Sequence, residues 1–198
     1  MIFKVWNRYT ISGEHQLPPN GQGFILAANH VSYLDPPVIG SRIRRPVVFL
    51  AKEKLFSIRW LGPVIQWLGA LPVAGDSDFR SLRNVIKSLK TGHAVVIFPE
   101  GTRASVDEFL DPHPGVIFLA HAAKVPIVPC YIHGTHLAWP KRARYFRPAK
   151  IHVSIGQPIH VESVDHKEKN AYYDQCAQLV MQKIKELKEQ NATNGNEK

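Results

Sequence analysis

The chain has 198 residues, of which 44% are hydrophobic and 21% charged, and this composition predicts a globular protein with a packed core rather than a disordered or collagen-like chain. Its 25 Lys and Arg residues outnumber its 16 Asp and Glu residues, and the formal net charge of +9 favours an anionic partner: a nucleic acid, an anionic bilayer or a phosphorylated small molecule. The two cysteines stand in unrelated contexts, which supports neither a disulfide framework nor a thiolate metal site.

Short β-rich runs alternate with helical patterns along the chain. This alternation predicts a single α/β domain with a central mixed, partly parallel sheet flanked by helices. In chain order, the expected strands are residues 24–28, 47–51, 70–73, 94–98, 127–132 and 151–155.

Two amphipathic helices are expected among these strands and after them. Leu82, Val85 and Leu89 share one helical face, and Thr91 and Gly92 end that helix. A second apolar stripe runs from Cys176 to Leu187 and predicts a C-terminal helix. We place the domain at residues 1–190 and expect the polar segment 191–198 to be frayed or disordered.

The longest apolar stretch covers residues 60–74 and is interrupted by Pro63, Gln66 and Pro72. A helical span of a bilayer needs about 20 apolar residues, so we expect no membrane crossing here. The large apolar and aromatic side chains of this stretch suit burial against the sheet and also suit the membrane interface. The first fifteen residues lack the apolar run of a signal peptide, so we expect no export.

A polar block, ANHVSYLDPP (residues 28–37), follows the first expected strand. Pro36 suits the first turn of a helix, so we expect Asp35 to be the N-cap and the stretch from His30 to Asp35 to be a turn. Such a turn would fold the imidazole onto the carboxylate and leave the other ring nitrogen to take a proton from a hydroxyl. The alternative is a capping Asp and a His that merely fills the turn.

A second block, VVIFPEGTR (residues 95–103), is a buried strand that ends in Pro, Gly and two charged residues. Ligand sites of α/β sheets lie beyond the carboxyl ends of strands. Gly101 would let the backbone approach a ligand, and Arg103 offers a planar fork for a phosphate. The alternative is a strand-exit turn with a surface salt bridge between Glu100 and Arg103.

Together the two blocks, in this order and about 70 residues apart, resemble the glycerolipid acyltransferase family that includes the lysophosphatidic acid acyltransferases. NHVSYLDP resembles the family's HxxxxD block, IFPEGTRA its FPEGTR block and VPIVPCYIHGT (residues 125–135) its VPxVPV block, and the resemblance runs from about Leu17 to Pro158. It implies that His30 is the general base and that Asp35 orients it. It further implies that the acceptor, with its phosphate on the arginine, is bound by Asn29, Glu100, Gly101, Thr102 and Arg103.

The resemblance also implies a reaction: a fatty acyl group passes from acyl-CoA or acyl-carrier protein to the sn-2 hydroxyl of lysophosphatidate, giving phosphatidate in phospholipid biosynthesis. The attack is direct, without an acyl-enzyme, in agreement with the absence of a GxSxG elbow and with Cys130 lying in an apolar strand. The acyl carrier is a co-substrate, and we expect no cofactor and no metal. We expect a peripheral protein on the cytoplasmic, inner face of an anionic membrane, with no nucleic-acid partner.

Three features depart from the family pattern or stay outside it. Gly75 stands where relatives carry Arg in a pattern like PVDR, and Arg80 or Arg83 is our candidate to reach the acceptor phosphate instead. His113 stands where many relatives have Lys, with a substrate-binding role or none. The basic and aromatic segment from Lys141 to Lys150 suits anionic headgroups or the carrier's phosphates, and equally a solvated loop.

These departures keep other functions open. The same chemistry could serve a different acceptor: glycerol 3-phosphate, another lysophospholipid or an aminolipid. A noncatalytic basic domain that binds a membrane or a nucleic acid is a further alternative.

Overall fold

The structure is a computed structural model that describes residues 9–41, 43–59, 61–73, 79–106, 108–140, 145, 147–162 and 168–195. Among these residues seven strands form one sheet: β1 (Tyr9–Ser12), β2 (Phe24–Ala28), β3 (Val47–Lys52), β4 (Ala70–Val73), β5 (Ala94–Ile97), β6 (Ile127–His133) and β7 (Ile151–Ile155). The helical elements are η1 (Glu14–Gln16), α2 (Asp35–Gly40), α3 (Glu53–Phe56), α4 (Leu61–Trp67), α5 (Phe79–Lys90), α6 (Gly115–Ala123), α7 (Thr135–Ala138) and α8 (Lys169–Gly195).

The strands are ordered β1-β7-β6-β2-β5-β3-β4. Neighbours from β6 to β4 run parallel, β7 runs antiparallel to β6, and β1 runs parallel to β7. The sheet is therefore mixed and mostly parallel, as expected. Because β2, β3, β5 and β6 are parallel, their carboxyl ends meet at one edge of the sheet, where ligands of α/β folds bind.

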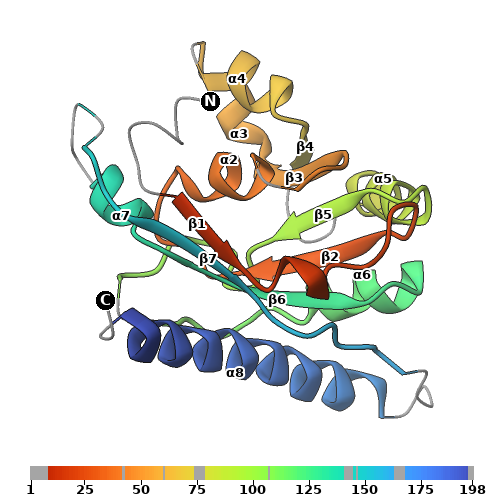
Figure 1. Ribbon diagram of the computed structural model, residues 1–198. Coiled ribbons are helices and arrows are strands. Elements are labelled where there is room, and N and C mark those ends of the chain that lie inside the picture. The colour runs from red at the N-terminus through yellow and green to blue at the C-terminus, as the bar shows by residue number, and fades with distance from the viewer. Residues whose placement is uncertain are drawn as a thin grey trace.

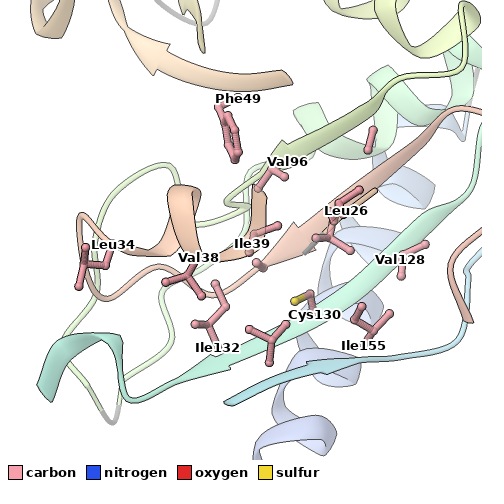
Figure 2. Close-up of a cluster of buried hydrophobic side chains, with 14 of the residues drawn as sticks. Leu26, Leu34, Val38, Ile39, Phe49, Val96, Val128, Cys130, Ile132 and Ile155 are labelled. Atoms are coloured by element: carbon pink, nitrogen blue, oxygen red, sulfur yellow. The ribbon is translucent and has the colours of Figure 1, made fainter. Parts of the chain in front are cut away.

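Side chains of the central strand β2 alternate between two cores. Phe24, Leu26 and Ala28 belong to a cluster on one face that also holds side chains of α2, and Figure 2 shows Leu26, Val38 and Cys130 within it. Ile25 and Ala27 point to the other face, which α5, α6 and α8 cover (Figure 1). Side chains on both faces of β2 are buried, which explains why this strand is apolar throughout rather than alternating.

The expected strands are confirmed within one residue at each end, and the expected helix around Leu82 is α5. Gly92 ends α5 with a positive φ of 88°, a conformation that Gly adopts without a steric penalty. The chain adds β1, which the sequence analysis missed. No helix among the described residues is long and apolar enough to span a bilayer.

Two expectations need correction. Asp35 is the first residue of α2 rather than its N-cap, which is Leu34, because the Asp35 side chain turns back toward the preceding loop. The C-terminal helix α8 continues through Gly195, past the boundary at residue 190 where we expected order to end. Its last turns stay helical although they bury little apolar surface, and the Thr193 hydroxyl donates to the Glu189 carbonyl there.

Candidate active site

The loop that leaves β2 brings His30 and Asp35 into contact. The distance from His30 Nδ1 to Asp35 Oδ2 is 2.8 Å, so the expected turn is confirmed. An ionised carboxylate accepts but does not donate, so Nδ1 carries the hydrogen of this bond and Nε2 keeps its lone pair. Among the residues that the structure describes, none is hydrogen-bonded to Nε2. That nitrogen is therefore available to take a proton.

The Asp35 carboxylate is fully buried and accepts four hydrogen bonds. Oδ2 also accepts from the backbone N–H groups of Val31 and Ser32, each at 2.8 Å. Oδ1 accepts from the Thr135 hydroxyl at 2.6 Å, across 100 residues of sequence. A buried carboxylate held by this many donors has little freedom to rotate, and it fixes the orientation of the imidazole.

The His30 ring is held from its flat side as well. It stacks on Phe98 with ring centroids 4.1 Å apart and planes 18° apart. The His30 side chain is 17% exposed, whereas that of Asp35 is 0% exposed. The imidazole is thus held by the Phe98 ring on its flat side and by the Asp35 carboxylate at Nδ1. The Nε2 edge of the ring is left for a reactant.

Glu100 has a different environment from the one that the sequence suggested. Its side chain is 2% exposed, and its two oxygens accept from the backbone N–H groups of His30, at 3.3 Å, and Leu110, at 3.0 Å. Burial raises the pKa of this carboxyl group above its ordinary value, and the two backbone hydrogen bonds partly offset that shift. The surface salt bridge to Arg103, which was the alternative interpretation of this block, is absent among the described contacts, and Glu100 instead joins two loops of the site.

Asn29 and Gly101 also support the site's backbone. The Asn29 amide donates to the Ile132 carbonyl at 3.1 Å and accepts from the Ile132 N–H at 2.7 Å, which locks the exit of β2 to β6. Gly101 has a φ of 64°, and a Cβ there would lie 2.9 Å from the His113 ring. Both residues thus hold the backbone of the site, with His113 packed beside Gly101, and their predicted contacts with substrate stay predictions.

Arg103 lies at the rim of the site. Its guanidinium stands over the Tyr33 ring, 3.7 Å from the centroid, and donates to the Tyr33 hydroxyl at 3.0 Å. The Ala104 N–H donates to the His30 carbonyl at 2.9 Å, which ties the arginine loop to the histidine loop. Thr102 is exposed on the same loop. A cation therefore stands on the same pair of loops as the base.

The other predicted residues lie elsewhere. Arg80 and Arg83 are exposed on α5, which follows the edge strand β4, and β3 and β5 separate that strand from β2. The structure does not bring them into the cluster around His30 that the contacts above define. Gly75 lies outside the described residues, as do residues 141–144 and 146 of the basic segment.

The sequence analysis missed Thr135, Tyr33 and Phe98. Thr135 stands directly after β6, whose carboxyl end meets the same sheet edge as that of β2, and this strand-exit position was the available signal. Tyr33 lies inside the first polar block. No sequence pattern distinguishes Phe98, at the exit of β5, from an ordinary core residue.

The arrangement is suited to activating a hydroxyl group beside an anion. Nε2 of His30 can accept the proton, Asp35 stabilises the imidazolium that results, and Arg103 offers a charge-assisted, bidentate contact to a phosphate. Cys130 is not a competing nucleophile: it is fully buried in β6, and burial raises the pKa of its thiol.

Comparison with known proteins agrees with this chemistry. A family model described as Acyltransferase matches residues 8–133. A 1-acyl-sn-glycerol-3-phosphate acyltransferase of Bacillus subtilis is 30% identical over 187 residues, which cover 93% of this chain and 87% of that protein. A protein of the same name from Cocos nucifera is 28% identical over 166 residues, covering 82% of this chain and 54% of that protein.

A solved structure has the same fold. The crystal structure of the 1-acyl-sn-glycerophosphate (LPA) acyltransferase PlsC from Thermotoga maritima aligns with a TM-score of 0.71 and 29% sequence identity. The alignment covers 93% of this chain and 73% of that one.

Proposed function

Because this chain belongs to the Acyltransferase family, we propose that it transfers a fatty acyl group from an acyl thioester to the sn-2 hydroxyl of lysophosphatidate, giving phosphatidate. The three relatives described above are named as acyltransferases of 1-acyl-sn-glycerol phosphates, and each match covers at least 82% of this chain. The observation that carries the proposal is the 2.8 Å contact between His30 Nδ1 and the buried Asp35 carboxylate. It leaves a single oriented nitrogen at the site's open edge.

In the proposed step, Nε2 of His30 takes the proton of the acceptor hydroxyl as its oxygen attacks the thioester carbonyl carbon. The new C–O bond forms and the carbonyl π electrons move onto oxygen. When the carbonyl reforms, the C–S bond breaks and the thiolate leaves with the proton from Nε2. The products are an ester and a free thiol, and no acyl-enzyme is formed. Acyl-CoA and acyl-carrier protein both supply such a thioester.

The first experiment is a transfer assay with lysophosphatidate and either acyl-CoA or acyl-carrier protein as the donor. His30→Ala should abolish transfer with both donors while circular dichroism and the urea unfolding midpoint stay close to wild type, since the side chain is at the edge of the core. Full activity in this variant would overturn the proposal. The ratio of kcat/KM for the two donors identifies the carrier.

Arg103 is proposed to bind the acceptor phosphate, together with Thr102 on the same loop. Tyr33 holds the guanidinium by stacking and by a hydrogen bond, so its direction is set before substrate arrives. Arg103→Ala should raise the KM for lysophosphatidate more than the KM for the donor. Arg103→Lys should recover little, because an ammonium lacks the planar fork. Equal effects on both substrates would contradict this role.

The acceptor could also be a related phosphate ester, since Gly75 replaces the arginine of the family's second block. Arg80 and Arg83 stay our proposed substitutes for that cation. A panel of lysophosphatidate, glycerol 3-phosphate, other lysophospholipids and an aminolipid, run with one labelled donor, separates these acceptors. The double variant Arg80→Gln/Arg83→Gln should lower the rate only with the acceptor whose phosphate these residues reach.

We further propose that the protein works peripherally on the cytoplasmic, inner face of an anionic membrane, without a cofactor, a metal or a nucleic-acid partner. The net charge of +9 supports attraction to anionic lipid. The proposed proton transfer uses only His30 and Asp35, so activity should persist in a chelator. Loss of activity in the chelator that a divalent ion restores would contradict the metal part of the proposal, and sequence-selective binding of a nucleic acid at physiological salt would contradict the last part.

A further inference from the structure

Helix α4 is apolar on two opposite sides. Its inner residue Ile65 packs against the core cluster of the sheet, as does Phe56 of α3. On its outer side Pro63, Val64 and Trp67 are exposed, and Val64 and Trp67 are 47% and 85% exposed. We call these three residues the α4 outer face. A helix with apolar side chains on two sides is normally covered on both by protein or lipid, and within the described part of the chain only the inner side of α4 is covered.

The outer face is held in place by close packing behind it. Gly62 of α4 is buried, and a Cβ at this position would lie 2.2 Å from the Phe56 carbonyl oxygen. The Gly62 N–H donates to the Ile58 carbonyl at 2.8 Å, which joins the turn after α3 to α4. This packing fixes α3 against α4, and the pair lies at the upper end of the molecule in Figure 1. The direction in which the exposed side chains of Val64 and Trp67 point is therefore fixed as well.

The segment that leads into α4 carries exposed cations. These cations are Lys52, Lys54 and Arg59. In the sequence from position 52 to position 73, Glu53 is the single acidic residue. An exposed Trp on a segment that also carries Lys and Arg matches what the interface of an anionic bilayer requires: the ring enters the headgroup region while the cations pair with phosphates.

The location of α3–α4 connects this face to the active site. The pair follows the carboxyl end of β3, and β3 is joined to β2 through β5, with all three strands parallel. The segment thus leaves the same sheet edge that carries His30 and Glu100. A bilayer bound at the α4 outer face would hold that edge close to the lipid surface, where the proposed acceptor and product reside.

We propose that the α4 outer face, with Lys52, Lys54 and Arg59, is the surface by which the protein docks onto an anionic bilayer. The inference rests on the proposed lipid substrate. The occupant is lipid rather than a second copy of the chain or an acyl-carrier protein, because a two-turn helix bearing one bulky Trp and flanking cations suits shallow insertion. A protein interface of ordinary size would need about 800 Å² per partner, which a few side chains on one short helix do not supply.

The test measures cosedimentation with vesicles made of equal parts phosphatidylglycerol and phosphatidylcholine, and with pure phosphatidylcholine vesicles. The apolar variant is Val64→Gln/Trp67→Gln. Its matched control is Leu179→Gln, which removes a 39% exposed apolar residue from α8 on the opposite face of the sheet. The apolar variant should bind mixed vesicles at least roughly tenfold more weakly than wild type. The control should bind like wild type.

The charge variant Lys52→Gln/Lys54→Gln/Arg59→Gln isolates the electrostatic part. Each lost cation should weaken binding to the anionic vesicles roughly fivefold at low salt, and added salt should weaken wild type more than the variant. Binding to pure phosphatidylcholine should change little. Undiminished anionic preference in this variant, or wild-type binding in Val64→Gln/Trp67→Gln, would overturn the proposal.

Two further measurements separate this inference from the proposed function and from other occupants. With a short-chain lysophosphatidate dissolved as a monomer, the apolar variant should keep its transfer rate, whereas with substrate in vesicles it should be slow. Vesicle binding through the α4 outer face in a chain that lacks transferase activity would overturn the function alone. Conversion of a dimer into a monomer by Val64→Gln/Trp67→Gln, or loss of activity with acyl-carrier protein but not with acyl-CoA, would assign the face to a protein partner and overturn the inference.

Discussion

The hydroxyl of Thr135 should support both the stability of the protein and the orientation of its base, and Thr135→Val tests this. Valine keeps the shape of the side chain but removes the 2.6 Å hydrogen bond to Asp35 Oδ1. Both residues are fully buried, so no water replaces the lost donor. A hydrogen bond to a charged group contributes about 1.5–3 kcal/mol, and we expect the free energy of unfolding to fall by about 2 kcal/mol.

The same change should lower kcat, since the carboxylate that aligns the imidazole loses one of its four anchors. We expect a loss of roughly tenfold with little effect on either KM, because the hydroxyl touches Asp35 and lies behind the open edge of the ring. Urea unfolding and the transfer assay measure the two quantities. Thr135→Ser, which keeps the hydroxyl, is the matched control and should retain most of both. A valine variant as stable and as active as the serine variant would refute the reasoning.

Three further predictions concern neighbouring residues. Because burial raises the pKa of Glu100, the unfolded chain loses this proton at lower pH than the folded chain. The free energy of unfolding of wild type, relative to that of Glu100→Gln, should therefore fall as pH rises above the ordinary glutamate pKa and level off once the folded carboxyl is also ionised. A pH-independent difference between the two proteins in urea unfolding would contradict this. Gly101→Ala forces a left-handed φ on alanine and places its Cβ against His113, so the free energy of unfolding should fall by about 1–3 kcal/mol. A thermal midpoint equal to that of wild type would show that the loop changes conformation without loss of stability. With a thiol reagent, native protein should react at half-buried Cys176 and not at Cys130, and denaturant should expose both; rapid native labelling of Cys130 would mean that β6 opens readily.

Much of the fold could be predicted because local patterns and tertiary packing agree. Strands such as β2 and β5 are short apolar runs bounded by turn signals, and α5 carries its apolar stripe at regular helical spacing. The first strand was missed because the sequence YTIS is too short and polar for its pattern to stand out. It is defined by pairing with β7, which lies more than a hundred residues away in sequence.

The site shows a similar division. The contact between His30 and Asp35 was predictable because Pro36 excludes a continuous helix and leaves a turn. The role of Glu100 was not, since a carboxylate after a strand gives no sign of whether it faces solvent or two backbone N–H groups. The partner of Asn29 was not predictable for the same reason: it is the backbone of Ile132, and a backbone partner cannot be recognised from the sequence.

The 100-residue separation between Asp35 and Thr135 has a consequence for biosynthesis. A chain emerging from the ribosome exposes its histidine and aspartate early, but the carboxylate acquires its last anchor only when β6 has been made and has joined β2. The segment that follows β2 also lacks support until then, because the hydrogen bond from the Asn29 side chain to the Ile132 carbonyl cannot form before Ile132 has been added. An incomplete chain that stops before residue 132 therefore lacks both the Thr135 anchor of the carboxylate and the backbone partner of Asn29.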